Sequence, residues 1–562
     1  MSIIVTKAKN DIKTIILDAA KKAMENGQLC SAELTDFTVE VPQNRAHGDY
    51  AINAAMVWSR LFRTAPRNIA EALISNMSLD GSYIEKCEIA GPGFINLFLS
   101  QKYYADIVAD VLNKGSDYGK SDYGKGEKVL VEFVSANPTG PMHIGNARGG
   151  ALGDCLAAVL SAAGYYTERE FYINDAGNQI NKFGLSLDLR YQQLYKDGIE
   201  MPEDSYHGDD IVAHAKAFAE IHNDSFIEKS EEERRKALVE FALPKNIEGL
   251  ERDLLKYRIK YDTWFKESTL HNGGETAKII ELLKQSGKTY VEEDALWFKA
   301  TDYGCDKDFV LVRANGVPTY VVPDIAYHYN KLVTRGFNRA IDILGADHHG
   351  YVPRLKAALT ALGVDASRLD VVLMQMVRLV RDGEVIKASK RSGKAITLVT
   401  LLEEVPIDAA RFFFNLREPN SHFDFDLDLA VNESNSNPVY YVQYAYARIC
   451  SILRNLEAEG IKAVECDSEK LSLLTAPEEK ELILHIAALT DEIVASAKAY
   501  DPAKITHYVQ ELATKFHKFY AACRVKGIDE NLMLARLLLC KATATVIKNV
   551  LTMLKIEAPE KM

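Results

Sequence analysis

One stretch of the chain, residues 128–164, constrains the fold more than any other. Its apolar run KVLVEFVS is typical of a buried parallel strand, and the turn-rich loop ANPTGPMHIGNARGG follows it. The apolar segment ALGDCLAAVLSAAG comes next and has the pattern of a helix closed by Gly164. A strand, a glycine-containing loop and a helix in this order open a nucleotide-binding fold, so the sequence predicts an α/β core.

Length, charge and composition indicate a soluble protein of several domains. The chain has 562 residues, more than one hydrophobic core usually serves. Its net charge of −12 disfavours nucleic-acid binding on its own, so any RNA contact must come from local basic patches. No stretch approaches the roughly 18 uncharged apolar residues of a membrane span, and the N-terminus lacks a signal-peptide cleavage site. We therefore expect a cytoplasmic enzyme with no membrane partner.

The cysteines predict neither a zinc site nor a disulfide scaffold. None of the eight forms the close pairs that bind zinc, and they are too sparse for a disulfide-rich fold. We expect most of them to be buried and reduced, with no structural zinc, no other bound metal and no prosthetic group.

Changes in sequence pattern divide the chain into four parts. Residues 1–115 mix helical and strand patterns, and the tandem SDYGK repeat at 116–125 is predicted to be an exposed linker. Residues 126–400 contain the α/β core, interrupted at about 185–292 by a charged helical insertion. Residues 401–436 form a junction. Residues 437–562 repeat apolar side chains at helical spacing, which predicts an all-α bundle.

The segment His143-Ile144-Gly145-Asn146 lies at the predicted strand-to-helix junction. Activation of a carboxylate by ATP requires stabilisation of the negative charge that builds on the α-phosphate as pyrophosphate leaves. A helix N-terminus offers free backbone N–H groups, His143 adds a donor, and Gly145 lets a nucleotide approach the backbone. An ordinary loop histidine is the alternative, which this segment alone does not exclude.

A second basic segment, KASKRSGK, covers residues 387–394. Its ammonium groups are suited to neutralising the β- and γ-phosphates of ATP in the transition state. Taken by itself, the segment is equally consistent with a solvated basic turn.

Together, these two segments resemble the HIGH and KMSKS signatures of class I aminoacyl-tRNA synthetases. Within that class the chain is similar to the arginyl-tRNA synthetase family over nearly its whole length. The resemblance is carried by VEFVSANPTGPMHIGNARGGALGD, FYINDAGNQI, PTYVVPDIAYHYNK, GADHHGYVPR, KASKRSGKAITL and DAARFFFNLREPNSHFDFDLDLA. The chain departs from the signatures at Asn146 and Ala388. Neither departure removes His143 or Lys390, the groups with the electrostatic role.

The resemblance implies a Rossmann-type class I catalytic core, with an N-terminal additional domain that contacts tRNA and a C-terminal anticodon-binding bundle. It implies an arginine–tRNA ligase whose substrates are ATP, accompanied by Mg²⁺, L-arginine and the tRNA for arginine. We expect it to act as a monomer. The implied catalytic residues are His143, Asn146, Lys387, Ser389 and Lys390. The implied ATP-binding residues are His143, Gly145, Asn146, His348, Met376, Val377 and Lys390.

Selection of arginine calls for carboxylates, because the guanidinium group is planar, always charged and carries five donors. The resemblance points to Glu132 and Asp324 as these acids. It adds Tyr320 at the guanidinium, Ser135 and Asn137 at the α-amino and carboxylate end, and His348. Each acid has a structural alternative: Glu132 pairs with a structural arginine, or Asp324 caps the helix that begins near it.

Tyrosines in the C-terminal region suggest an RNA contact. Tyr440, Tyr444 and Arg448 are spaced to form an aromatic and basic cluster on which splayed anticodon bases can stack. Ordinary core packing of the tyrosines is the alternative. The rival functions are a class I synthetase for lysine or glutamate, a non-catalytic tRNA-binding paralogue, and a small-molecule ligase.

Overall fold

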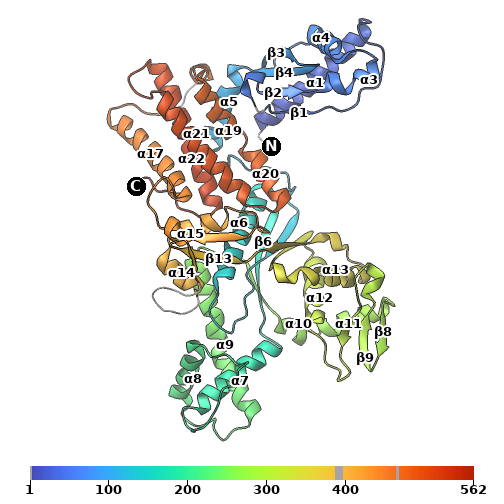
Figure 1. The fold of residues 1–562 in the computed structure, drawn as a ribbon, viewed down its shortest axis with the longest axis vertical. Helices are drawn as coiled ribbons and strands as arrows, with labels where there is room; N and C mark the ends of the chain where they lie inside the picture. The colour runs from blue at the N-terminus through green and yellow to red at the C-terminus, as the bar shows by residue number, and fades with distance from the viewer. Residues whose placement is uncertain (1–2, 43, 387–395, 464–467) are drawn as a thin grey trace.

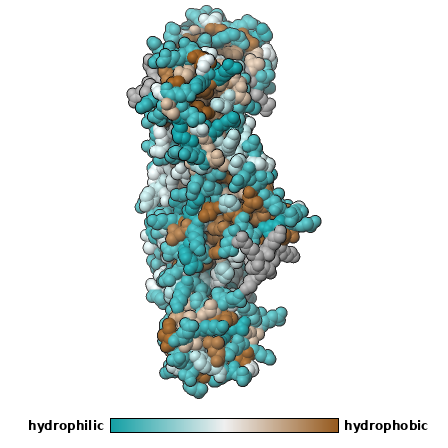
Figure 2. All heavy atoms as spheres, turned by 90° about the vertical axis from the view of Figure 1, so that its left-hand side faces the viewer, coloured by the Kyte–Doolittle hydropathy of each residue, from teal (hydrophilic) through white to brown (hydrophobic). Residues whose placement is uncertain are grey.

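The computed structural model describes residues 3–42, 44–386, 396–463 and 468–562. The molecule is elongated, with a central α/β core, an N-terminal unit and a helical domain at one end, and a small helical bundle at the other (Figure 1). The face in Figure 2 is mostly hydrophilic, with its broadest apolar area at mid-height. None of the helices in the described ranges is long and apolar enough to cross a membrane.

The core is a parallel sheet of five strands. Their order is β12 (Leu369–Met374), β11 (Arg339–Gly345), β5 (Lys128–Glu132), β6 (Tyr166–Ile173) and β7 (Thr263–Lys266). The central strand β5 is the apolar run that the sequence predicts, and helix α6 (Ile144–Ala162) follows it. A Cβ atom at Gly153 of α6 would lie 2.1 Å from the Phe133 side chain, so only glycine lets the helix approach this closely.

The segment expected to be one helical insertion at 185–292 divides into separate units. The first is a bundle of α7 (Asn178–Gln192), α8 (Asp209–His222) and α9 (Glu231–Lys256), with its own hydrophobic core. Strand β7, which lies inside the expected insertion, instead pairs with β6 at the edge of the main sheet. The run of four residues, TWFK, is too short to give a clear strand signal among its charged neighbours.

The second unit packs beside α12 (Val321–Tyr329) and α13 (Val352–Ala361), at the right of Figure 1. It contains α10 (Ser268–Asn272), α11 (Glu275–Gln285) and an antiparallel sheet of β8 (Thr289–Glu292), β9 (Ala295–Phe298) and β10 (Phe309–Val312). Helix α12 continues into a π-helical turn, Asn330–Thr334, which brings Lys331 into contact with Asp342 of β11.

The N-terminal residues form the α+β unit that the sequence predicts. Its antiparallel sheet has the order β1 (Val39–Glu40), β2 (Tyr50–Ile52), β4 (Phe94–Leu99), β3 (Ile84–Ala90). The helices are α1 (Ile3–Glu25), α2 (Ala54–Val57), α3 (Ser59–Phe62) and α4 (Pro66–Asn76), and α5 (Gln101–Lys114) leads from this unit to the rest of the chain. Pro66 is the first residue of α4, where its fixed φ favours the helix.

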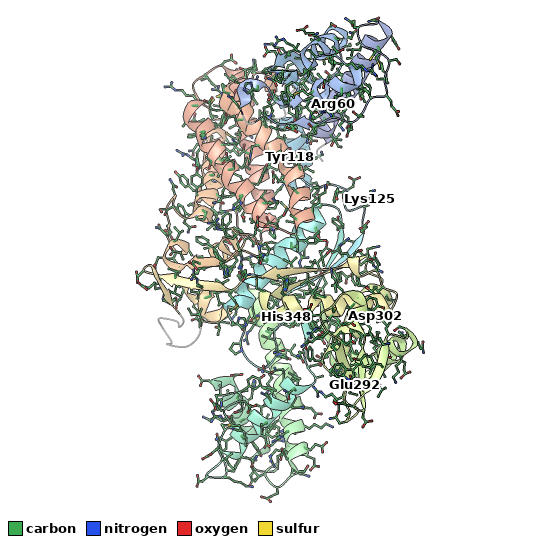
Figure 3. The ribbon with its side chains drawn as sticks, turned by 45° about the vertical axis from the view of Figure 1, so that its right-hand side comes forward. Arg60, Tyr118, Lys125, Glu292, Asp302 and His348 are labelled. Atoms are coloured by element: carbon green, nitrogen blue, oxygen red, sulfur yellow. The ribbon has the colours of Figure 1, made fainter. Side chains whose placement is uncertain are left out.

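The SDYGK tandem is an exposed linker only in part, because six of its ten residues are exposed while Tyr118, Gly119 and Gly124 are buried. Tyr118 is 3% exposed, and its hydroxyl donates a hydrogen bond to the carbonyl of Ile486, 3.1 Å away. Figure 3 labels Tyr118 among the C-terminal helices. A Cβ atom at Gly124 would lie 2.5 Å from the ring of Tyr165, so this glycine is tightly packed as well. Tyr118 and the two glycines thus pack against neighbouring elements although the segment is polar in composition, while the second aromatic residue, Tyr123, is 42% exposed.

The C-terminal residues form the expected helical bundle. Between it and the core lie β13 (Val377–Arg381), β14 (Glu384–Ile386), α14 (Leu398–Glu404), α15 (Ile407–Phe414), β15 (Phe423–Asp426) and α16 (Leu427–Ala430). The bundle itself contains α17 (Pro438–Ala458), α18 (Ser468–Leu471), α19 (Pro477–Ala487), α20 (Leu489–Ala499), α21 (Ala503–Ala522) and α22 (Glu530–Met553).

Arg411, a fully buried side chain of α15, joins the core to the bundle. Its guanidinium donates to Asp154 of α6 at 2.5 Å, and Asp154 also pairs with Arg169 of β6 at 2.8 Å. The Arg411 guanidinium also donates to the carbonyl of Tyr257 after α9, at 2.9 Å, and to the carbonyl of Leu554 after α22, at 2.8 Å. Because a buried donor without a partner costs about 1–3 kcal/mol, these contacts fix the three elements relative to one another.

Candidate active site

The loop between β5 and α6, residues 133–143, ends in a hydrogen-bonded helix cap. Nδ1 of His143 accepts a hydrogen bond from the backbone N–H of Gly145 at 3.1 Å. Oδ1 of Asn146 accepts in return from the backbone N–H of His143 at 3.0 Å. Asn146 therefore completes a capping box.

This cap also sets the protonation of His143. Because Nδ1 accepts a hydrogen bond, the ring proton of the neutral imidazole is on Nε2, which stays available as a donor. Burial lowers the pKa of His143 below its ordinary value, which favours this neutral form. The geometry presents a neutral N–H donor at the N-terminus of α6, beside its free backbone N–H groups.

The β5–α6 loop leaves the sheet through a strained turn. Val134 and Ser135 have φ angles of 70° and 40°, a region that a β-branched residue such as valine rarely adopts. The hydroxyl of Ser135 donates to Glu132 at 2.8 Å and accepts from the N–H of Tyr172 at 3.1 Å. The loop then lines a cavity of about 480 Å³, together with Tyr206, Gly208 and Asp210, and the predicted site residues there are Ser135, Asn137, His143 and Asn146.

Glu132 lies in a buried network of charges at the end of β5. Its carboxylate contacts Nζ of the fully buried Lys331 at 2.5 Å, and Lys331 also contacts Asp342 at 2.9 Å. Asp342 is bonded in turn to Nε2 of His328 at 2.6 Å. Glu132 thus has a buried structural partner, which is a lysine and not the arginine that the alternative predicts.

The same network has the residue types of a metal site. Glu132, His328 and Asp342 present ligand atoms within 4.8 Å of one another. The ammonium group of Lys331 contacts both carboxylates and supplies the positive charge that a cation would otherwise bring. The donor set is therefore that of an ion-pair cluster, and this is the single such group of metal-binding residue types in the described ranges.

A larger cavity, of about 1040 Å³, is lined in part by Tyr172, whose backbone N–H donates to Ser135 of the loop. Asp324, Glu267 and Tyr320 line it, together with residues of α7, α10 and the β10–α12 segment. Asp324 is the fourth residue of α12 and makes no capping bond, so the capping alternative is wrong. Its carboxylate accepts instead from the hydroxyl of Tyr351 at 2.5 Å.

The acids of this cavity carry the charge that suits a cationic ligand. Burial raises the pKa of Asp324 to about 6, against the opposing hydrogen bond from Tyr351, and nearby Glu267 raises it further. A positive ligand between the two carboxylates would relieve their repulsion. Glu267 was missed in the sequence because it follows the unrecognised strand β7. Acids placed directly after parallel strands are the signal that could have found it.

The remaining predicted residues are spread around the core. Tyr320 is 69% exposed, and its ring lies 5.9 Å from that of Tyr351. His348 is exposed in a short 3₁₀ turn and is labelled in the central region of Figure 3. Met376 is 73% exposed and Val377 is 9% exposed, at the junction of β12 and β13. His348, Met376 and Val377 do not line either cavity. Lys387, Ser389 and Lys390, with Ala388, lie outside the described residues.

The predicted RNA-contact residues form one ladder on α17 and α21. The rings of Tyr440 and Tyr444 are parallel, with centroids 6.4 Å apart, and Tyr444 also stacks on His517 at 6.0 Å. The guanidinium of Arg448 lies 5.7 Å from the Tyr444 ring and 4.7 Å from that of Tyr520. All three predicted residues are half-buried, so each keeps an accessible face.

Three family descriptions match consecutive parts of the chain. "Arginyl tRNA synthetase N terminal domain" matches residues 10–99, and "tRNA synthetases class I (R), catalytic domain" matches residues 107–434. "DALR anticodon binding domain" matches residues 442–562. These matches and the observed architecture confirm the predicted fold class.

Similar proteins extend over the whole chain. It is 54% identical to an arginine–tRNA ligase of Caldanaerobacter subterraneus subsp. tengcongensis, over 562 residues and 100% of each chain. It is 52% identical to an arginine–tRNA ligase of Acetivibrio thermocellus, over 564 residues and 100% of each chain. The arginyl-tRNA synthetase structure of Thermus thermophilus has the same fold, with a TM-score of 0.74 at 22% identity, covering 97% of this chain and 99% of that one. The chain therefore belongs to the arginyl-tRNA synthetase family.

Proposed function

We propose that the protein is an arginine–tRNA ligase. It activates L-arginine with ATP to arginyl-adenylate, releasing pyrophosphate, and transfers arginine to the 3′ end of its tRNA, giving arginyl-tRNA and AMP. The observation that carries this function is the cavity walled by Asp324 and Glu267, which adjoins the β5–α6 loop with its capped His143. The identity above 50% to relatives named arginine–tRNA ligase supports the same activity.

The β5–α6 loop and the N-terminus of α6 are proposed to bind ATP. The Nε2 donor of His143 and the backbone N–H groups behind Gly145 stabilise the charge that develops on the α-phosphate. Asn146 holds His143 in place through the cap. By family resemblance, the remaining residues proposed to bind ATP or act on it are His348, Met376, Val377, Lys387, Ser389 and Lys390.

The guanidinium of arginine is proposed to bind between Asp324 and Glu267, against the ring of Tyr320. Ser135 and Asn137 hold the α-amino and carboxylate end at the neighbouring loop. Glu132 acts indirectly, by holding Ser135, because both of its carboxylate oxygens are already bonded, one to Ser135 and one to Lys331.

The other expectations belong to the same proposal. Magnesium arrives with ATP as part of the substrate, and the tRNA binds through the N-terminal domain and the ladder of Tyr440, Tyr444 and Arg448. The proposed division is 1–115, 126–400, 401–436 and 437–562, with separate units within 185–292. The protein works in the cytoplasm as a monomer, without structural zinc.

Aminoacylation of a total tRNA pool, with each amino acid supplied in turn, tests the function. Only arginine should be charged, and only when ATP is present. Charging of another amino acid, or none with arginine, would refute the proposal.

Replacing His143 with asparagine should lower kcat for arginine activation by about 10²–10³-fold with little change in KM, because a donor to the transition-state charge is lost. Asparagine retains an N-cap oxygen, so the melting temperature should stay close to that of the wild type. Pyrophosphate exchange with tRNA present measures the rate. An unchanged kcat would remove His143 from the mechanism.

The kcat/KM for arginine should change with pH around pH 6. Asp324 must be ionised to bind the guanidinium, and its pKa is raised to about 6, so kcat/KM for arginine should fall as the pH drops below that value, approaching tenfold per pH unit. Tyr351→Phe removes a hydrogen bond that lowers this pKa and should move the inflection to higher pH. Steady-state charging between pH 5 and 8 tests this, and a flat profile would contradict it.

A further inference from the structure

Helix α9 connects two hydrophobic cores. Its N-terminal half packs Leu238 and Ala242 into the core of the α7–α9 bundle, and its C-terminal half packs Leu250 and Leu254 into the main core. Figure 1 shows the helix leading from the bundle to the centre of the molecule. Pro244 lies between the two halves. Because proline has no N–H, one hydrogen bond of the helix is missing at this point, and the halves are less rigidly joined.

Asn246 lies two residues after Pro244 and makes a polar connection between the bundle and the β5–α6 loop. Its Nδ2 donates to the carbonyl of Pro138 in the loop at 2.9 Å. Its Oδ1 lies 2.7 Å from Nε2 of His214 on α8. Since an amide oxygen only accepts, His214 must donate, and the orientation of the Asn246 amide is fixed from both sides.

Packing at this contact is open. A cavity of about 710 Å³ separates the bundle from the loop, and its lining includes Gly140, Pro141, His214 and Asn246. Pro138 is buried, and the loop is held further along by the bond from the N–H of Leu398 to the carbonyl of Met142, at 2.9 Å. Beside this cavity, the directional hydrogen bond from Asn246 links the loop to the bundle at a fixed distance.

We propose that Asn246 is a positioning residue for the activation step, which rests on the function proposed above. It holds the carbonyl of Pro138, and with it the β5–α6 loop that ends at His143, at a distance set by the α7–α9 bundle. A shift of the loop by about 1 Å is enough to cost about 10²-fold in rate when it moves groups that face ATP. Asp324 and Glu267 lie on other segments, so selection of the guanidinium group is independent of this bond, whereas Asn137, at the other end of arginine, lies next to Pro138.

Asn246→Asp is the discriminating variant, because it keeps the shape and the contact with His214 but cannot donate to Pro138. We expect kcat for arginine activation, measured by pyrophosphate exchange with tRNA present, to fall about 10–100-fold, with KM for ATP raised. Discrimination of arginine against citrulline, which depends on Asp324 and Glu267, should stay within about twofold of wild type. Asn246→Ala should behave alike. His214→Gln supplies a new donor and should retain most of the activity. Glu248→Ala, an exposed change on the same helix, is the matched control and should behave as wild type.

Thermal unfolding and a double-mutant cycle separate positioning from a structural role. The melting temperature of Asn246→Asp should lie within a few degrees of that of the wild type. Adding His214→Ala to this variant should lower kcat little further, because His214 acts through Asn246. Wild-type kcat in Asn246→Asp would overturn the proposal. So would a loss of discrimination between arginine and citrulline together with a strongly lowered melting temperature. Failure of the proposed function is distinct, because the wild-type protein would then not charge arginine.

Discussion

Replacing Asp324 with asparagine is expected to lower kcat/KM for arginine by about 10³–10⁴-fold, because the cavity loses the charge that its ligand pairs with. Asparagine has the same shape and still accepts a hydrogen bond from Tyr351, so the cavity stays intact. Charging with arginine and with citrulline, its uncharged analogue, measures the loss of discrimination. Glu132→Gln, whose carboxylate is already paired with Lys331, should act mainly by loosening Ser135. If Asp324→Asn keeps wild-type discrimination, this model of arginine recognition is wrong.

The same substitution should stabilise the protein without its substrates. The folded-state pKa of Asp324 is raised from 3.8 to about 6, so above pH 6 the fold holds an ionised acid that burial disfavours. That penalty is absent below the unfolded pKa and fully present at neutral pH, where it amounts to about 3 kcal/mol at most. A raised melting temperature at pH 7.5, with the gain shrinking at pH 5, is the expected result. The control is Asp302→Asn, an exposed acid paired with Lys288, which should change neither activity nor stability appreciably.

Replacing Lys331 with methionine should lower the free energy of unfolding by about 3–5 kcal/mol, because it leaves Glu132 and Asp342 buried without their cation. Methionine has a similar volume, so the loss is electrostatic and not caused by a cavity. Urea unfolding followed by circular dichroism measures it. Lys288→Met removes a lysine from a surface ion pair and serves as the matched control, with little expected change.

The loss of unfolding free energy caused by Lys331→Met should become smaller as the pH falls. Burial disfavours ionisation of Asp342, but Lys331 and His328 hold its pKa well below the ordinary value. A depressed pKa contributes stability above the unfolded pKa that is lost as the pH falls toward the folded one. The difference between wild type and Lys331→Met should therefore narrow below about pH 4. A constant difference down to pH 3 would show that Lys331 acts through packing instead.

The local parts of the site could be predicted from the sequence, and its long-range partners could not. His143, Gly145 and Asn146 are neighbours in one motif, so the strand-to-helix junction was recognisable. Glu132 and Lys331 are 199 residues apart, and no local pattern indicates that a lysine after α12 will reach β5. Glu267 was hidden because β7 has only four residues. Tyr118 was misjudged because polar composition says little about which side chains another domain will cover.

The contacts of Arg411 have a consequence for how the protein is made. Its guanidinium holds α6 through Asp154, but one of its acceptors, the carbonyl of Leu554, is more than 140 residues further along the chain. While the chain is being synthesised, the main sheet and α6 emerge long before that acceptor exists. The buried charge at the centre of the core is then only partly satisfied, and its last partner arrives with the end of α22. Completion of the nucleotide-binding core thus waits until α22 and Leu554 have been synthesised, and a nascent chain stopped before α22 would keep an incompletely paired core.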